Sequence, residues 1–181
     1  TNAKPEEIQK VFKDSFYENN FLTVTVRTAA SAKGFGEPKE VEITTYRLEA
    51  KYSDKRHPDQ VKYAEKLEDD LSRRDFTINA MAMDENKKVV DLFEGQKDLK
   101  NKIIRTVGNP EERFNEDALR MLRAVRFATT LGFEIEEKTA AAIKKNSIWL
   151  EAISQERIRD EFVKIIMSDN ATQGIELLRE L

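Results

Sequence analysis

The sequence contains no cysteine and only one histidine, His57. The absence of cysteine excludes a disulfide framework and a thiolate zinc site, and a single histidine excludes a multi-histidine metal site. Any bound metal would need oxygen ligands, which favours Mg²⁺ or a similar hard cation. His57 itself lies in a polar stretch, so we interpret it as a surface residue.

The chain also lacks a long apolar run, a recognisable secretion signal and an excess of charge of one sign. These features predict a cytoplasmic protein that does not engage a membrane. The 31 Lys and Arg residues nearly balance the 34 Asp and Glu residues, for a net charge of -3. Any nucleic-acid contact must therefore come from a local basic surface. The balance gives no indication of oligomeric state.

The length of 181 residues suggests one or two domains with enough material for a core. The chain begins at Thr1 rather than methionine, and it stops inside a helical pattern at residues 174–181. We expect it to be a fragment of a longer protein.

The first half of the chain has strand-like patterns. Apolar and polar residues alternate over residues 22–27, which predicts a half-buried strand, and over residues 41–46, which predicts a second strand antiparallel to the first. A helix starting at Pro5 is predicted before them. Further short elements are predicted after them: a helical turn at 76–79, strands at 80–83 and 88–91, and an extended segment at 103–107.

Helical patterns take over after residues 108–110. Asn115 is predicted to be the N-cap of a helix that runs to about Thr130, with Glu116 and Asp117 in its first turn. Shorter helices are predicted over 139–145 and from a cap at Ser154, and Trp149 is expected to anchor the packing between helices. The layout predicts an α+β unit over residues 1–108 and an all-helical unit over residues 109–181.

The predicted helix after Asn115 carries three arginines on one side. At about 100° per residue, Arg120, Arg123 and Arg126 share an arc roughly 120° wide. The apolar residues expected to pack inward on the other side are Ala118, Met121, Leu122, Val125 and Ala128. One interpretation is a solvated face with an ion pair between Asp117 and Arg120.

Two features favour a binding site on this arc instead. Leu119 and Phe127 interrupt it, so it is not a plain solvated face. Three arginines without a lysine favour planar, bidentate recognition of a phosphate or a base edge. Because Asp accepts and Arg donates, Asp117 and Arg120 together could match the edge of a base.

Arg74 and Asp75 form a second candidate site. Arginine can hold a triphosphate, and a carboxylate can accept hydrogen bonds from ribose hydroxyls. The alternative is a charged turn after the acidic residues 68–70. Glu42, in the middle of a predicted strand, could be a metal ligand, but phosphoryl transfer commonly uses carboxylates that hold two metal ions, and one glutamate cannot do that. A solvent-facing Glu42 is the simpler interpretation.

Four blocks, in order, resemble one enzyme family. Residues 67–80 look like its ribose-recognition motif, residues 91–99 like its hinge motif, residues 116–120 like its EDxxR nucleotide-selecting motif, and residues 153–158 like the block that stabilises its neck. The family is that of the class II tRNA nucleotidyltransferases, or CCA-adding enzymes, with the related bacterial poly(A) polymerases. The resemblance implies a polymerase β-like head with a mixed or antiparallel sheet, its N-terminal part missing, followed by a helical neck.

The resemblance also implies a reaction and its partners. C and A residues would be added without a template to the 3′ end of tRNA, from CTP and ATP, with Mg²⁺ and release of pyrophosphate. By position, Asp75 would read the ribose and Arg74 would hold phosphates, with Asn79 in the same motif. Asp117 and Arg120 would read the base edges of C and A.

The resemblance gives roles to further residues. Arg123 and Arg126 would support the base reader and the triphosphate. Glu42 aligns with the third catalytic carboxylate, a tentative metal ligand. Asp54 and Arg56 match the flexible loop that helps to switch specificity from C to A. We expect an Arg120→Ala variant to lose base selectivity while keeping the fold.

The sequence also departs from the family pattern. The Gly-Gly phosphate loop and the DxD metal ligands that precede the first helix are absent, so we expect the 181 residues alone to be inactive. The stretch at residues 51–60 favours a CCA-adding enzyme over a poly(A) polymerase. An A-adding enzyme and a non-catalytic nucleotide- or RNA-binding module stay open. A CC-adding enzyme fits less well, and a plain charged helical scaffold fits least.

Overall fold

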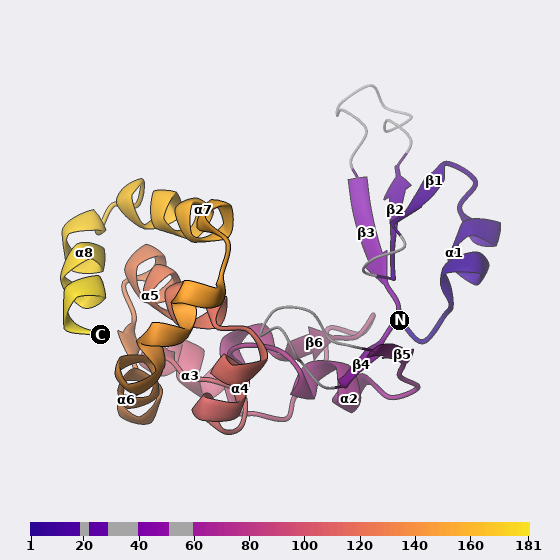
Figure 1. Ribbon diagram of the computed structural model, residues 1–181. Coiled ribbons are helices and arrows are strands. Elements are labelled where there is room, and N and C mark those ends of the chain that lie inside the picture. The colour runs from indigo at the N-terminus through magenta and orange to yellow at the C-terminus, as the bar shows by residue number, and fades with distance from the viewer. Residues whose placement is uncertain (19–21, 29–39, 51–59) are drawn as a thin grey trace. The chain divides into compact units, whose positions relative to one another are not determined.

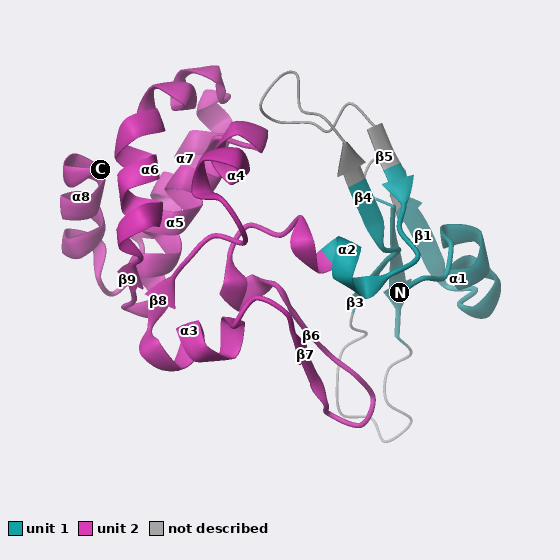
Figure 2. Cartoon of the chain, turned by 90° about the horizontal axis from the view of Figure 1, so that it is seen from below, with its two compact units in different colours: residues 1–48, 62–70 teal, residues 49–61, 71–181 magenta. Residues whose placement is uncertain are grey.

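The computed structural model describes residues 1–18, 22–28, 40–50 and 60–181. The predicted loop residues Asp54 and Arg56, and also His57, lie outside the described residues. The chain forms two compact units, residues 1–48 with 62–70 and residues 49–61 with 71–181 (Figure 2). The predicted boundary at residue 108 does not coincide with this division and stays a prediction.

The first unit is built around a small sheet (Figure 1). Its elements are α1 (Pro5–Val11), β1 (Ser15–Glu18), β2 (Thr23–Arg27) and β3 (Glu40–Thr44). The three strands form an antiparallel sheet in the order β1-β2-β3, which confirms the predicted antiparallel pairing. Pro5 begins α1, as predicted, with Glu6 and Glu7 in the first turn. Ile8, Val24 and Val26 form the core of this unit.

The prediction that β2 is half-buried was wrong. Thr23 and Thr25 are buried together with Val24 and Val26. The strand lies between β1 and β3, and the Thr23 hydroxyl is 3.0 Å from the Thr44 hydroxyl, so a hydrogen bond satisfies its polar side chain. The prediction counted the threonines as solvent-facing polar residues, but a threonine can be buried when its hydroxyl group is hydrogen-bonded.

Three elements follow near the division between the units. They are β4 (Arg47–Ala50), its partner strand β5 (Gln60–Tyr63), and α2 (Leu67–Ser72).

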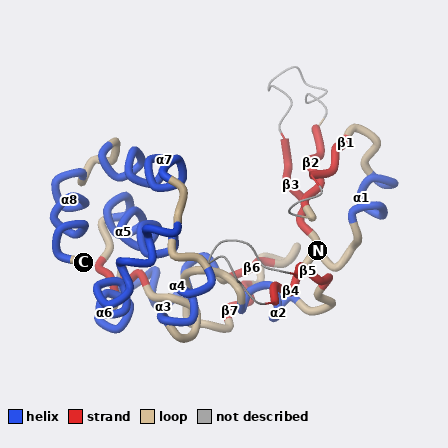
Figure 3. Tube along the Cα trace, viewed as in Figure 1, coloured by secondary structure: helices blue, strands red, loops and turns tan. Residues whose placement is uncertain are grey.

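The second unit is mainly helical (Figure 3). After a 3₁₀ turn at Thr77–Asn79, its elements are β6 (Met81–Met83), β7 (Val89–Asp91), α3 (Gly95–Asn101), β8 (Ile103–Ile104), α4 (Pro110–Glu116), α5 (Leu119–Leu131), β9 (Glu134–Ile135), α6 (Glu137–Asn146), a 3₁₀ turn at Ser147–Ala152, α7 (Gln155–Ile166) and α8 (Ala171–Glu180).

Two short ladders accompany these helices. β6 pairs antiparallel with β7, and β8 pairs parallel with β9, so the region predicted to be helical also contributes one two-residue strand. Phe76 forms an isolated antiparallel bridge with Thr106. This bridge ties the segment that carries Asp75 to the chain after β8. Gly95 allows α3 to approach the same segment, because a Cβ there would lie 2.3 Å from the Thr77 carbonyl oxygen.

Helix α5 is the centre of the second unit. It packs against α4, α7 and α8. The residues predicted to face inward are all buried: Ala118, Met121, Leu122, Val125 and Ala128. Phe76 contacts Phe127 edge to face, with ring centroids 5.7 Å apart, and Trp149 packs against the same core, as predicted.

The helix predicted from Asn115 is broken in two. Asn115 lies inside α4, whose N-cap is Asn109, with Pro110 at the first position and a hydrogen bond from the Glu111 N–H to the Asn109 side chain. Asp117 is extended, with φ -144° and ψ 106°, so the helical wheel that placed it beside Arg120 was wrong. The break has a local cause, because the Asp117 carboxylate accepts from the Leu119 N–H and starts α5.

Candidate functional site

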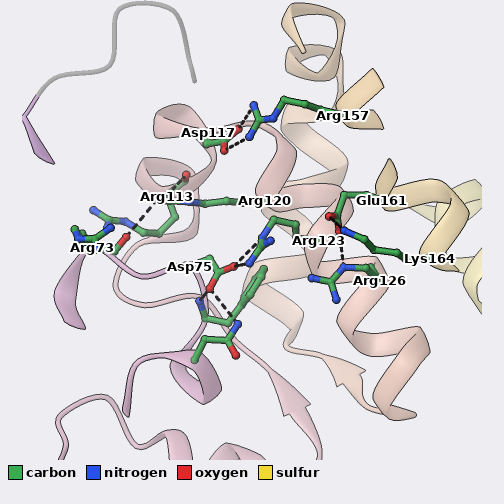
Figure 4. A network of polar contacts seen from close by, with 12 residues as sticks. Arg73, Asp75, Arg113, Asp117, Arg120, Arg123, Arg126, Arg157, Glu161 and Lys164 are labelled. Atoms are coloured by element: carbon green, nitrogen blue, oxygen red, sulfur yellow. Dashed lines mark hydrogen bonds and ion pairs between the residues drawn. The ribbon is translucent and has the colours of Figure 1, made fainter. Parts of the chain in front are cut away.

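Asp75 is held by hydrogen bonds in a buried position, and its side chain is central to one polar cluster in the second unit (Figure 4). Its backbone carbonyl accepts from the Val107 N–H at 3.0 Å, which continues the bridge between Phe76 and Thr106. The carboxylate accepts from the Phe76 N–H at 2.9 Å and from the Asn79 amide at 3.2 Å. Asn79, predicted to belong to the site, is therefore a direct partner of Asp75.

Arg123 of α5 completes this cluster. Its Nε and Nη2 atoms both donate to Asp75 Oδ2, at 2.9 and 2.6 Å. Burial raises the pKa of Asp75, but the Arg123 charge and the hydrogen bonds from Arg123, Asn79 and Phe76 outweigh it, so the pKa lies below its ordinary value. The four donors match the roughly four acceptor positions of a carboxylate. Asp75 is therefore saturated in this structure.

Asp117 is held from a different helix. The Arg157 guanidinium of α7 donates to both carboxylate oxygens, from Nη1 to Oδ1 at 3.3 Å and from Nη2 to Oδ2 at 2.7 Å (Figure 4). The Leu119 N–H donates to Oδ1 at 3.1 Å. These three bonds leave about one acceptor position, on Oδ2, for another donor.

Arg120 does not pair with Asp117. Its Nη1 donates to Glu116 at 2.5 Å and to the Arg113 carbonyl at 3.2 Å, while its Nη2 donates to the Arg73 carbonyl at 3.3 Å. The side chain is only 11% exposed, so the interpretation of a solvated face with an Asp117–Arg120 ion pair was wrong. Three of the five N–H groups of the guanidinium are used, and two are left for a ligand. Because Arg120 links three segments, its removal should also affect stability, which revises the expectation that Arg120→Ala would spare the fold.

Arg126, the third arginine of α5, points to a buried carboxylate. Its Nε donates to Glu161 of α7, which also accepts from Lys164 at 2.9 Å. Burial raises the pKa of Glu161, but the hydrogen bonds from Lys164 and Arg126 and their charges outweigh it, so the pKa is lowered. The Arg126 guanidinium also lies 3.9 Å from the centroid of the Phe127 ring, a cation–π contact.

Sequence reasoning missed two members of this network. Arg157 lay inside the block at residues 153–158 but was given no role, and Glu161 was not singled out. The two residues are four apart on α7, so they lie on one face of the helix. A pair of opposite charges at that spacing on an amphipathic helix was a visible signal, but it did not identify Asp117 and Arg126 as the partners.

The other predicted residues have simpler surroundings. Arg74 is exposed and directly precedes Asp75. Glu42 is exposed on β3 of the first unit, opposite Thr25 in the sheet register. Among the residues that the structure describes, no three His, Cys, Asp or Glu side chains come together to hold a metal ion. No helix in the described ranges is long and apolar enough to cross a membrane.

The sequence matches two family profiles. One, described as the poly A polymerase head domain, matches residues 1–105, more than half of the chain. The other, described as a probable RNA and SrmB-binding site of polymerase A, matches residues 132–181. The arginines of α5 lie between these two matched ranges.

The chain is also similar to curated proteins and solved structures that are named CCA-adding enzymes. It is 51% identical to the CCA-adding enzyme of Ligilactobacillus salivarius and 48% identical to that of Enterococcus faecalis, each over 97% of this chain but only 42% and 41% of the relative. The chain thus spans about two fifths of the length of these relatives. The crystal structure of the Bacillus stearothermophilus CCA-adding enzyme in complex with CTP superposes with a TM-score of 0.86 at 38% identity, over 99% of this chain and 41% of that one.

A second solved structure extends the comparison to an RNA complex. The Thermotoga maritima CCA-adding enzyme complexed with tRNA superposes with a TM-score of 0.70 at 27% identity, over 97% of this chain and 38% of that one. The matched profile, the sequence identities and the shared fold agree with the four sequence blocks. The chain belongs to the poly A polymerase head domain family, within which its similarity is to the CCA-adding enzymes.

Proposed function

We propose that this chain is the nucleotide-selecting part of an enzyme that adds C and A residues to the 3′ end of tRNA from CTP and ATP, releasing pyrophosphate. The observation that carries the proposal is the identity of about half of its residues, over 97% of the chain, with CCA-adding enzymes. Solved relatives with CTP, ATP and tRNA support the same substrates. A tRNA substrate also fits the predicted cytoplasmic location.

The chemistry of Asp117 supports the choice of bases. Cytosine and adenine carry exocyclic amines, N4 and N6, where thymine or uracil O4 and guanine O6 are acceptors. An ionised carboxylate can only accept hydrogen bonds. The open position on Asp117 Oδ2 therefore suits C and A and opposes U and G. The two unused N–H groups of Arg120 would donate to a ring nitrogen of the same base.

Asp75 would contact the sugar, with Arg74, Arg123 and Arg126 near the triphosphate. Because the Asp75 carboxylate already has four donors, a ribose hydroxyl must replace one of them. Arg123 is the partner that we expect to leave, because its side chain is 33% exposed and phosphate is a strong ligand for guanidinium. In this proposal, nucleotide binding moves Arg123 from Asp75 to a phosphate and frees Asp75 for the ribose.

The proposed reaction implies Mg²⁺, but the described residues do not form a site for it. Glu42 could supply one oxygen ligand, but the described part of the chain contains no group of three His, Cys, Asp or Glu side chains that could hold a metal ion. A two-ion site needs several oxygen ligands, so the other ligands must come from elsewhere in the protein. The residues of this chain would select and orient the nucleotide.

The proposal is tested with the gene product that contains these residues. A tRNA transcript without its 3′ CCA is offered with Mg²⁺ and CTP alone, ATP alone or both, beside an oligo(A) primer. Growth of the tRNA by three residues only when both nucleotides are present is the expected result. The absence of any extension would overturn the proposal in favour of a non-catalytic nucleotide- or RNA-binding module.

A poly(A) polymerase is the second candidate, because the family profile that matches residues 1–105 carries that name. The same experiment separates the two activities. Long A tails on the tRNA or on the oligo(A) primer would identify a poly(A) polymerase. Addition of a single A only to a tRNA that already ends in CC would identify an A-adding enzyme.

A further inference from the structure

Helix α7 contacts the candidate site through two charged residues one turn apart. Arg157 holds Asp117, and Glu161 holds Arg126 of α5. The residues between and around them include Arg159, which is 68% exposed and pairs only with its neighbour Asp160 among the described residues. Helix α7 therefore supplies a positive charge to Asp117, just before α5, and a negative charge to Arg126 within α5.

The contact of Arg157 with Asp117 fixes an orientation. A guanidinium is planar, and when its two Nη atoms donate to the two oxygens of a carboxylate, the two groups are held close to one plane. Asp117 lies in an extended link between α4 and α5, where the Leu119 N–H holds Oδ1 and, among the described residues, Arg157 alone holds Oδ2. Within the described part of the chain, Arg157 makes no other hydrogen bond or ion pair, so its guanidinium serves Asp117 alone.

We propose that Arg157 is a specificity-determining positioning residue, which orients the Asp117 carboxylate so that its open acceptor position meets the amine of cytosine or adenine. The inference rests on the proposed base-reading role of Asp117. Arg157 does not touch the base; it removes the rotation by which Asp117 could move away from the O4 of uracil or the O6 of guanine. Loss of Arg157 should therefore relax the choice of base more than it weakens nucleotide binding.

The packing of α7 does not depend on Arg157 alone. Ile165 of α7 is fully buried, Glu161 is paired with Arg126, and Ile153 just before the helix belongs to the core. Variants of Arg157 should therefore keep α7 in place. Arg157→Lys keeps the positive charge but lacks the planar fork, so it separates charge from orientation. Arg159→Ala, on the same helix, is the matched control.

The test measures equilibrium dissociation constants for CTP, ATP, UTP and GTP without RNA, on the gene product that contains these residues. We expect the wild type and Arg159→Ala to prefer CTP and ATP. In Arg157→Ala the preference for CTP over UTP should fall by roughly tenfold or more, within the range that one well-placed contact to a base gives. Arg157→Lys should recover only part of it, and all variants should keep one cooperative urea transition, with a lower midpoint in Arg157→Ala because Asp117 loses its ion pair.

Three outcomes would overturn the inference. In Arg157→Ala the affinity for all four nucleotides could fall by one common factor, or Arg157→Lys could restore the full preference for CTP over UTP. The third is a wild type that binds all four nucleotides equally. Failure of the proposed function is a different result. A wild type that prefers CTP and ATP but never extends tRNA would refute CCA addition, while the ratios of dissociation constants would still decide the role of Arg157.

Discussion

Asp75 and Asp117 are both carboxylates held by an arginine, but their surroundings differ. Asp75 is 9% exposed and has four donors, two of them from its own segment. Asp117 is half-buried and has three donors, two of them from α7. The same kind of ion pair therefore leaves no open acceptor position on Asp75 and about one on Asp117. An arginine that pairs with a candidate site residue can occupy all of its acceptor positions or orient it with one position open for a ligand, and the count of donors distinguishes the two cases.

The difference suggests a division of labour. If Asp117 reads the base, as proposed, it can accept the amine of the base without losing a partner. If Asp75 reads the ribose, as proposed, it exchanges Arg123 for a ribose hydroxyl, so recognition of the sugar is coupled to release of a guanidinium toward the phosphates. Under this account, the base is read by a preset group and the sugar by a group that becomes available on binding.

Replacing Asp75 should give the largest loss of stability. Asp75→Ala leaves Arg123 without its partner and removes the acceptor of the Phe76 N–H and the Asn79 amide, so we expect the unfolding free energy to fall by about 3 kcal/mol. Urea unfolding followed by the fluorescence of Trp149, the only tryptophan, reports on this unit. Asp160→Ala removes an exposed ion pair and should change stability by less than about 0.5 kcal/mol. Equal losses in the two variants would show that Asp75 is not structural.

Replacing Arg120 should give an intermediate loss. Arg120→Ala removes hydrogen bonds to the carbonyls of Arg73 and Arg113 and an ion pair with Glu116, which we expect to lower the unfolding free energy by about 2 kcal/mol. The variant should also lose base selectivity if Arg120 reads a ring nitrogen. Arg159→Ala is the exposed control. An unchanged unfolding curve for Arg120→Ala would mean that the three contacts contribute little.

A smaller effect should appear in the dependence of stability on pH. The pKa values of Asp75 and Glu161 are lowered from 3.8 and 4.5 by folding. Their stabilisation is therefore fully present above those ordinary values and is lost as pH falls through the lower values of the folded state. Urea unfolding between pH 6 and pH 3 should show the loss, and Asp75→Asn with Glu161→Gln should flatten it. If the unfolding free energy of the double variant falls with pH as steeply as that of the wild type, Asp75 and Glu161 are not the groups responsible.

The sequence was sufficient to predict the elements whose signals are local. Alternation predicted β2 and β3, Pro5 predicted the start of α1, and helical spacing predicted which side of α5 packs inward. The resemblance of the four blocks identified the family and the candidate residues. Each of these patterns extends over several residues, so a single unexpected tertiary contact does not change the predicted element.

What could not be predicted depends on contacts between distant residues. The helical pattern continues through Asp117 in the sequence, but in the structure Asp117 is extended and pairs with Arg157 of α7. Arg157 is 40 residues away in sequence, and nothing in the local pattern of α7 names its partner. The polar residues Thr23 and Thr25 are buried for a similar reason, because the neighbouring strands that cover them are set by the tertiary fold.

The most direct test of the division of labour compares Asp75→Asn and Asp117→Asn with the wild type, using CTP, dCTP and UTP on a tRNA that lacks its 3′ CCA. Values of kcat/KM give two ratios, CTP over dCTP for the sugar and CTP over UTP for the base. The account predicts that Asp75→Asn lowers mainly the first ratio and Asp117→Asn mainly the second. Variants in which both ratios fall together, or in which neither ratio changes, would contradict it.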